Sequence, residues 1–188
     1  MIRCNLSILL AERDLRITKV SNDTGISRTT LTSLANNRSQ GIQLDTINTL
    51  CNYLQVGPEK LISYVPVEIK VNDVEIINNN TLNVKLEITK NSRTYICYLT
   101  GDCYTSLTDG MISGLDISID LYDEKLNNND EDIVKDNLLL IDAFSMLSIP
   151  FINDIEEKIV KEILLDLDEE LCTSHTIYFT WDKKLISK

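Results

Sequence analysis

The sequence is short of the residues on which several classes of protein depend. Its 188 residues include one histidine and six glycines, and they contain neither a phosphate-cradling glycine loop nor a serine with a recognisable lysine or histidine base. No apolar run approaches the roughly 18–20 residues that span a membrane, and charged residues stop the N-terminal apolar stretch at Glu12. We therefore expect neither secretion nor membrane insertion, and we predict that the protein is not an enzyme.

Cysteine usage and overall composition restrict the compartment and the size of the domains. The five cysteines are odd in number and scattered over positions 4, 51, 97, 103 and 172. This pattern does not suggest a disulfide framework, so a reducing cytoplasm is the predicted compartment. The composition, 43% hydrophobic and 25% charged, is that of a globular protein and permits one domain or two small ones.

The charge is strongly acidic but unevenly distributed. The net charge of −11 argues at first against DNA binding. Residues 1–66, however, carry seven Lys or Arg and five Asp or Glu, a net charge of +2, whereas residues 67–188 carry eleven and 24, a net charge of −13. An acidic body is repelled by the duplex and leaves one weakly basic surface to face it.

The stretch from Ile17 to Asn36 predicts two short helices joined by a tight turn, the helix-turn-helix of DNA-binding regulators. The first helix is expected over Thr18–Thr24, beginning on a Ser/Thr-type cap. Gly25 supplies the turn, because a residue at positive φ is least costly as glycine. The second helix is expected over Ser27–Asn36, with its first residue as the N-cap.

This second helix has two distinct sides. Leu31 and Leu34 lie three residues apart and predict a buried stripe. Threonine is a mediocre helix former, so helix stability does not explain the three threonines here. Short hydroxyls and an arginine suit phosphate oxygens and base edges in the major groove. The residues predicted to face outward are Arg28, Thr29, Thr30, Thr32 and Ser33.

The spacing Ser21-x3-Gly25-x5-Leu31-x2-Leu34, followed by Asn37-Arg38-Ser39, resembles the Cro and phage-repressor type of helix-turn-helix, also called the XRE family. The resemblance covers about residues 2–64. It implies five helices, of which the third enters the major groove, and a following loop that touches the DNA backbone. An ordinary helical hairpin with a polar face is the alternative, and it is disfavoured because several features agree.

The resemblance also implies which residues contact DNA. Many relatives begin the second helix with a glutamine that bridges phosphate and recognition helix. This chain has Ile17 there, so Thr18 or Lys19 must replace that contact. The implied base-edge contacts come from Arg28, Thr29, Thr30 and Ser33. The implied phosphate contacts come from Arg16, Ser27, Arg38 and Gln43. Asn37 is also predicted to bind DNA.

The remaining helices of residues 1–66 complete an all-α, five-helix domain. A first helix is expected over Asn5–Asp14, a fourth from Asp45 to Leu54 and a fifth beginning at Pro58, with the junction at Val65-Pro66. The predicted apolar stripe of the fourth helix is Leu44, Ile47, Leu50, Cys51 and Leu54.

Residues 67–188 predict an α+β domain that serves dimerisation or binds a partner or signal. From Val67 the pattern alternates, which indicates four strands in an antiparallel meander. Asn72-Asp73 interrupts the first strand as a bulge or a tight turn, and Asn78–Asn80 is a predicted turn. Gly101–Gly114 is expected to be a polar loop between the third and fourth strands.

Two long helices and a last strand are expected to follow. The run Asn127–Asp132 is predicted to cap a helix over Glu131–Ser148, which Pro150 ends. The second helix, Ile152–Cys172, has a wide apolar stripe that is either core or a dimer seam. The strand Thr176–Trp181 adds to the same sheet or to that of another subunit.

Two other kinds of chemistry are disfavoured. Cysteines 97, 103 and 172 with His175 offer zinc-type ligands, but their spacing is not that of a zinc site. Glu68-Ile69-Lys70 imitates the E-x-K of metal-dependent nucleases, with Asp116 and Asp120 as remote carboxylates, yet such triplets arise by chance in an acidic chain. No cofactor or metal is predicted.

The sequence therefore predicts a sequence-specific transcriptional regulator. We expect a dimeric repressor of the prophage or mobile-element type that binds an operator in double-stranded DNA, since one helix-turn-helix reads too few base pairs alone. The alternative is a protein-interaction module in which residues 67–188 bind a partner such as a toxin or antirepressor, with DNA binding secondary.

Overall fold

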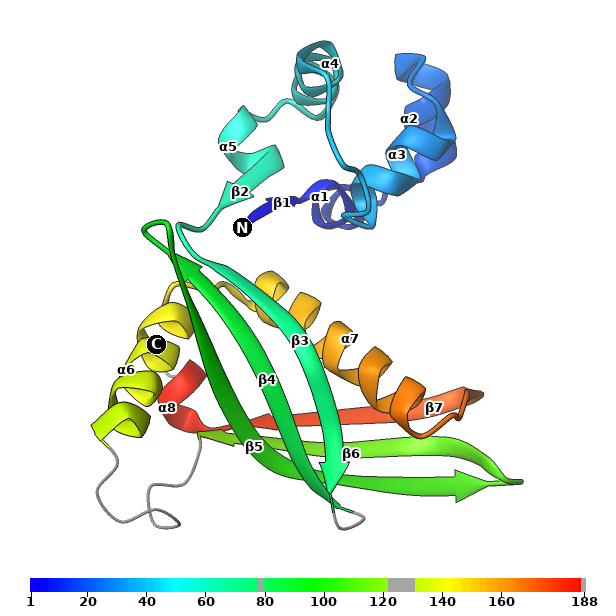
Figure 1. Cartoon of the computed structure of the whole chain (residues 1–188). Coiled ribbons are helices and arrows are strands. Elements are labelled where there is room, and N and C mark those ends of the chain that lie inside the picture. Colours follow the sequence, from blue (N-terminus) through cyan, green and yellow to red (C-terminus); the bar gives the residue numbers. More distant parts are fainter. Residues whose placement is uncertain (78–79, 122–130, 187–188) are drawn as a thin grey trace. The chain divides into compact units, whose positions relative to one another are not determined.

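The computed structural model describes residues 1–77, 80–121 and 131–186, except for the side chains of 131–133 (Figure 1). The chain divides into two compact units, Met1–Val65 and Pro66–Lys188. The turn predicted at Asn78–Asn80 and the helix cap predicted at Asn127–Asp132 depend on residues outside the described ranges.

The first unit combines five helices, as predicted for it, with a short two-stranded ribbon. The ribbon makes the predicted all-α class wrong for this unit, because β1 pairs antiparallel with β2. Strands of three residues are too short to show an alternating pattern, so sequence periodicity could not predict them. The elements are β1 (Ile2–Cys4), α1 (Leu6–Glu12), α2 (Ile17–Thr24), α3 (Arg28–Ala35), α4 (Leu44–Leu54), α5 (Pro58–Leu61) and β2 (Ile62–Tyr64).

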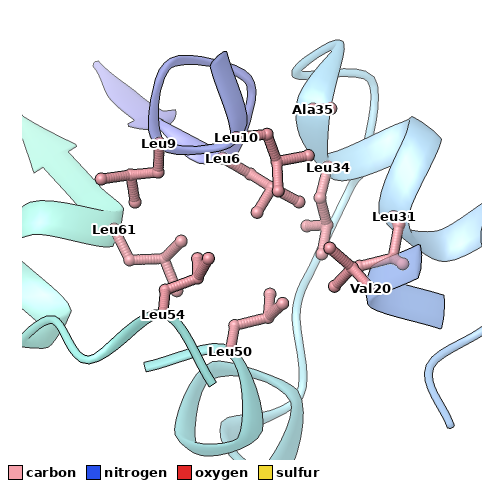
Figure 2. Close-up of a cluster of buried hydrophobic side chains, with 10 residues drawn as sticks. All are labelled: Leu6, Leu9, Leu10, Val20, Leu31, Leu34, Ala35, Leu50, Leu54 and Leu61. Carbon is pink, nitrogen blue, oxygen red and sulfur yellow. The ribbon is translucent and has the colours of Figure 1, made fainter. Parts of the chain in front are cut away.

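All five helices of this unit contribute to one apolar core (Figure 2). The predicted inward pair Leu31 and Leu34 is 0% and 3% exposed. Ile26 and Ile42, on the two loops that flank α3, pack against the same core. Burying such side chains stabilises a fold by about 1.5–3 kcal/mol each. The ten buried residues are Leu6, Leu9, Leu10, Val20, Leu31, Leu34, Ala35, Leu50, Leu54 and Leu61.

Two local predictions in this unit are wrong. α2 begins at Ile17, and its N-cap is Arg16, whose side chain makes no capping hydrogen bond, so the expected Ser/Thr-type cap is absent. Leu44 is 80% exposed instead of buried in the stripe of α4. It is the first residue of the helix and lies at the end away from the buried residues Leu50 and Leu54.

The second unit is a five-stranded sheet with helices packed on one face (Figure 1). The strands follow one another in the sheet in sequence order. Alternate side chains of β4 are buried and half-buried, which is the predicted pattern of a strand with one covered face. The strands are β3 (Glu68–Ile77), β4 (Thr81–Lys90), β5 (Arg93–Thr108), β6 (Met111–Leu121) and β7 (Leu171–Trp181).

The sheet is mixed, so the prediction of an antiparallel sheet is wrong in one strand. β3 to β6 form the expected antiparallel meander, whereas β7 pairs parallel to β6. Parallel neighbours need a long crossover, and the two long helices between β6 and β7 provide it. The last strand thus adds to the sheet of its own chain, which was one of the two predicted outcomes.

Two irregularities fix the register of the strands. The interruption in β3 is a bulge, since the pairing with β4 shifts between Val71 and Asp73. The predicted loop Gly101–Gly114 is mostly strand: β5 continues to Thr108, and β6 begins at Met111 after a turn at Asp109 and Gly110, both with positive φ. A two-residue Asp-Gly turn is a strong hairpin former, and the prediction overlooked it.

Three helices complete this unit: α6 (Glu131–Ser145), α7 (Ile149–Asp166) and α8 (Lys183–Ile186). The described residues therefore hold eight helices, one more than predicted. Pro150 does not end a helix but lies in the first turn of α7, where proline is well tolerated. The apolar stripe of α7 is core, because Phe151, Ile155, Ile159 and Ile163 are buried within the unit. No helix in the described part of the chain is long and apolar enough to cross a membrane.

Candidate DNA-binding site

The turn between α2 and α3 has the predicted helix-turn-helix geometry. Gly25 ends α2 with φ +76°, and its N–H donates to the Ser21 carbonyl at 3.0 Å. The Ser21 hydroxyl donates to the Ile26 carbonyl at 2.7 Å. The small residue at position 21 thus allows close approach and also ties the turn to the preceding helix.

Ser27 caps α3 as predicted, but the cap occupies its hydroxyl. The Ser27 Oγ accepts the N–H of Thr30 at 3.0 Å and lies 2.8 Å from the Thr30 Oγ1. The cap satisfies one of the N–H groups that a helix start leaves open. A phosphate contact from Ser27 therefore competes with an existing pair of hydrogen bonds.

The outward face of α3 is polar. At 100° per residue, Thr29 and Ser33 lie opposite the buried Leu31 and Leu34. Arg28 and Thr29 are exposed and Ser33 is half-buried. Neither Arg28 nor Thr29 forms a side-chain hydrogen bond or ion pair with another described residue, so both are free to meet a ligand.

The start of α3 and the loop after it enclose a shallow pocket of about 460 Å³. Gln43, the N-cap of α4, makes no side-chain capping bond, so the first N–H groups of that helix remain available to an anion. The structure therefore brings together two of the predicted phosphate-contacting residues, Ser27 and Gln43. The pocket is lined by Ile26, Ser27, Thr30, Leu34, Ser39, Gly41, Ile42, Gln43 and Thr46.

The residues proposed to replace the missing glutamine are exposed but differ in their freedom. The Lys19 Nζ lies 3.0 Å from the Asp23 Oδ2, and the Tyr53 hydroxyl donates to the same oxygen at 2.6 Å. The Tyr53 hydrogen bond, and after it the Lys19 hydrogen bond, hold the pKa of Asp23 below its usual value. This network links α2 to α4, and the Lys19 ammonium already has a partner within it. The side chains of Arg16 and Thr18 are exposed.

Asn37 is used by the fold more than the prediction allowed. Its side-chain oxygen accepts the Cys4 N–H at 2.7 Å, and its side-chain nitrogen donates to the Cys4 carbonyl at 3.1 Å. The residue has φ +52°, which asparagine tolerates better than most residues. Asn37 thus attaches the loop after α3 to β1. Its neighbour Arg38 is exposed.

Some residues of this surface were left out of the predicted contacts. Thr32 is exposed beside Arg28 and Ser33 on the helix face, and Ser39 and Thr46 line the pocket next to Gln43. The helical period alone placed Thr32 outward, so that residue was recognisable. The other two depend on how the loop folds back, which periodicity does not show.

The positive φ of Gly25 allows a direct test of the turn. We expect Gly25→Ala to destabilise the first unit by about 1–2 kcal/mol, because an L-residue is strained there. Gly41→Ala is the matched control: a Cβ meets nothing within 4 Å at either glycine, but φ is not positive at Gly41. Amide hydrogen exchange of α3 in the full chain measures the difference, and equal protection in both variants would contradict it.

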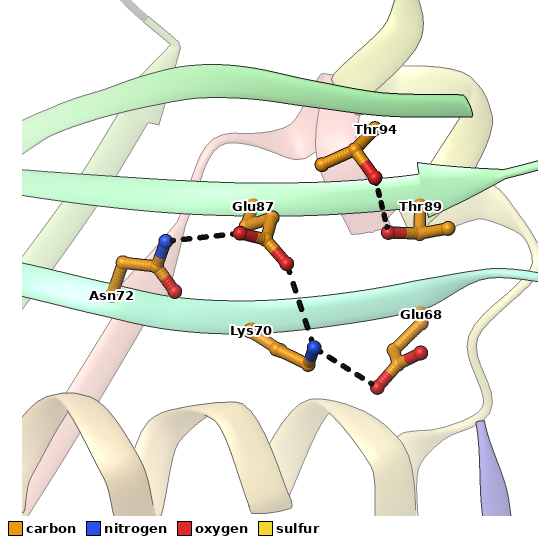
Figure 3. A network of polar contacts seen from close by, with 6 residues as sticks. All are labelled: Glu68, Lys70, Asn72, Glu87, Thr89 and Thr94. Carbon is orange, nitrogen blue, oxygen red and sulfur yellow. Dashed lines mark hydrogen bonds and ion pairs between the residues drawn. The ribbon is translucent and has the colours of Figure 1, made fainter. Parts of the chain in front are cut away.

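The residues considered for a zinc site and for a nuclease site have ordinary structural surroundings. Cys97 and Cys103 are buried on β5, and burial raises the pKa of both thiols, that of Cys97 to about 11. Across the described ranges, no three His, Cys, Asp or Glu side chains gather as metal ligands do. The Lys70 Nζ of the nuclease-like triplet lies 3.6 Å from Glu68 and 3.4 Å from Glu87 on the sheet (Figure 3). These contacts form a network of surface ion pairs.

The fold and the polar helix face define a helix-turn-helix DNA-binding protein. Residues 5–67 match the family model described as the Cro/C1-type HTH DNA-binding domain. The chain is 30% identical over 60 residues to YozG of Bacillus subtilis (strain 168), described as an uncharacterized HTH-type transcriptional regulator, and that match covers 32% of this chain and 71% of the relative. No solved structure matches the chain. The chain belongs to the Cro/C1-type helix-turn-helix family, as the sequence motif predicted.

Proposed function

We propose that the protein is a sequence-specific transcriptional regulator whose α3 reads an operator in the major groove. The observation that supports this most strongly is that Arg28 and Thr29 are exposed and bond to no other described side chain, on a helix whose opposite side is buried. Arginine matches the O6 and N7 atoms of guanine, and threonine offers a donor, an acceptor and a methyl group. Repression by occupying a promoter, in a prophage or other mobile element, is the proposed mode of action.

The proposed regulator acts as a homodimer. One α3 contacts too few base pairs for specific binding at physiological salt, so two copies on half-sites one helical turn apart are required. The stripe of α7 is used as core, and the dimer contact is therefore proposed elsewhere in the protein. The action is by binding alone, in the cytoplasm, without a reaction of its own.

A partner protein for the second unit is a second candidate function. On the sheet face opposite the buried side chains, Tyr104, Asp116 and Tyr178 lie side by side in register on β5, β6 and β7. The two tyrosines are 53% and 64% exposed. Tyrosine is enriched at protein interfaces, so this row favours a protein ligand such as a toxin or antirepressor.

Selection of bound sequences from random DNA tests the main proposal. The full chain is expected to enrich one sequence, and a dimer enriches two inverted half-sites separated by about one helical turn, roughly 10 base pairs between centres. Enrichment of a single, unrepeated site would contradict the proposed dimer but would still support sequence-specific binding. Recovery of unenriched DNA at every salt concentration would contradict sequence-specific binding and leave the second candidate.

A further inference from the structure

The second unit contains a basic pocket that DNA binding does not use. It has a volume of about 340 Å³ and lies where the β4–β5 turn meets α6. Volumes of this size fall at the lower end of small-molecule sites, which span about 300–1,000 Å³. The pocket, called here the hairpin pocket, is lined by Lys90, Asn91, Arg93, Tyr95 and Leu139.

Strand alternation assigns the polar residues of this pocket to the face of the sheet that carries the core. The buried residues of β4 are the even-numbered Leu82 to Ile88, and Lys90 continues that series. On β5 the buried series is odd-numbered, and Arg93 and Tyr95 belong to it. The side chains of these three residues therefore belong to the same face of the sheet as the core, although Arg93 and Tyr95 are exposed at this end of the strands.

The two cations also face each other. Lys90 pairs with Arg93 across the hairpin, and like charges directly opposite on neighbouring strands destabilise a sheet. The turn between them is tight, since Asn91 and Ser92 both have positive φ. The fold thus places two positive charges on neighbouring strands at the end of the hairpin.

The two cations differ in their partners among the described side chains. The Lys90 ammonium pairs with the Asp142 carboxylate of α6. The Arg93 guanidinium makes neither an ion pair nor a hydrogen bond with any side chain of residues 1–77, 80–121 and 134–186. An unpaired arginine is unexpected in a unit whose acidic residues outnumber its basic ones by 24 to eleven over residues 67–188.

We infer that the hairpin pocket binds a small organic carboxylate with an apolar body. The planar fork of Arg93 matches a carboxylate in bidentate geometry, and Lys90 adds a point charge beside it. Leu139 of α6 and the ring of Tyr95 provide apolar surface for the rest of the ligand. A bound carboxylate relieves the repulsion between the two cations. The inference is independent of the proposed function, because every residue belongs to the second unit.

Benzoate is a suitable probe, with inorganic phosphate and benzyl alcohol for comparison. We expect titration of the ¹⁵N-labelled full chain with benzoate to shift the amide resonances of residues 90–95 in a saturable manner. Phosphate, which has no apolar body, should bind more weakly, and benzyl alcohol, which has no charge, should leave these resonances unchanged. No DNA is present, so the result does not depend on operator binding.

Two variants separate the pocket from general charge effects. Arg93→Gln is expected to weaken benzoate binding by about tenfold or more, because a charge-assisted pair is lost. Lys158→Gln removes an exposed charge from α7 and should bind benzoate as the wild type does. The spectra of the unliganded variants show whether each one is folded. If Arg93→Gln unfolds, Arg93→Lys takes its place, and its affinity for benzoate is expected to fall several-fold. Equal binding by benzyl alcohol, an equal loss in the Lys158 variant, or no shift of residues 90–95 would each overturn the inference.

Discussion

Replacing both Arg28 and Thr29 by alanine is expected to remove the preference for operator over random DNA while leaving weak, salt-sensitive binding. Each residue is exposed on α3, and its side chain makes no hydrogen bond or ion pair with another described residue. The substitutions therefore remove the proposed DNA contacts without removing a side-chain hydrogen bond or ion pair of the fold. Alanine is also the best helix former, so the helix should gain slightly in stability.

The expected size of the effect follows from base-edge recognition. A bidentate arginine–guanine contact contributes about 1–3 kcal/mol of discrimination, which corresponds to roughly 5- to 150-fold in relative affinity. A mobility shift with operator and scrambled duplexes at matched salt measures both affinities. Salt must be fixed, because phosphate contacts dominate the non-specific part.

Lys60→Ala provides the matched control for the loss of charge. Lys60 is an exposed cation in the same unit, on α5 and outside the predicted contacts. Its removal should lower both affinities slightly and keep their ratio. Unchanged discrimination in the Arg28 and Thr29 variant would exclude α3 as the reading element and with it the proposed function.

The first unit was predictable because its determinants are local. Gly25 needs positive φ, Leu31 and Leu34 need one side of a helix, and Ser27 needs only the next turn to act as a cap. Each of these requirements is visible within a few residues. The ribbon that joins β1 to β2 was not visible, because residues about sixty positions apart meet in it.

For the second unit, the α+β class was predictable from the sequence, but the direction in which the last strand joins the sheet was not. Alternation identified β4 and most of β3, and the apolar runs identified α6 and α7. Alternation is the same in parallel and antiparallel strands, so it did not reveal that β7 lies parallel to β6. The crossover through two helices is determined by long-range packing, which the local sequence pattern does not show.

The candidate site shows the same division. The period of α3 placed Arg28, Thr29 and Ser33 on an accessible side. It did not show that Asn37 binds the backbone of Cys4 or that Lys19 pairs with Asp23. Those competing partners come from distant segments or from side-chain geometry, which spacing does not encode.

The larger expected loss of stability is at Gly101, which should be intolerant of even one added methyl group. A Cβ at this position would lie 1.8 Å from the Ser118 carbonyl oxygen and 2.9 Å from its carbonyl carbon. Both are backbone atoms of β6, so no side-chain rotation relieves the clash. Gly101 lies where β5 pairs with β4 and β6 at once, opposite Leu82 and Ile119. A glycine inside a strand commonly marks such a close approach.

We expect Gly101→Ala to lower the free energy of unfolding of the second unit by about 3 kcal/mol or more, since β5 and β6 must separate. Gly114→Ala is the matched control in the same sheet, because its Cβ would meet its nearest atoms at 3.5 Å, an ordinary contact. Trp181 is the one tryptophan of the sequence and is buried in this unit, with its ring centroid 5.4 Å from that of Phe144. Tryptophan fluorescence during unfolding in urea therefore reports on this unit alone. Equal unfolding midpoints for the two variants would show that β6 does not approach Gly101 closely.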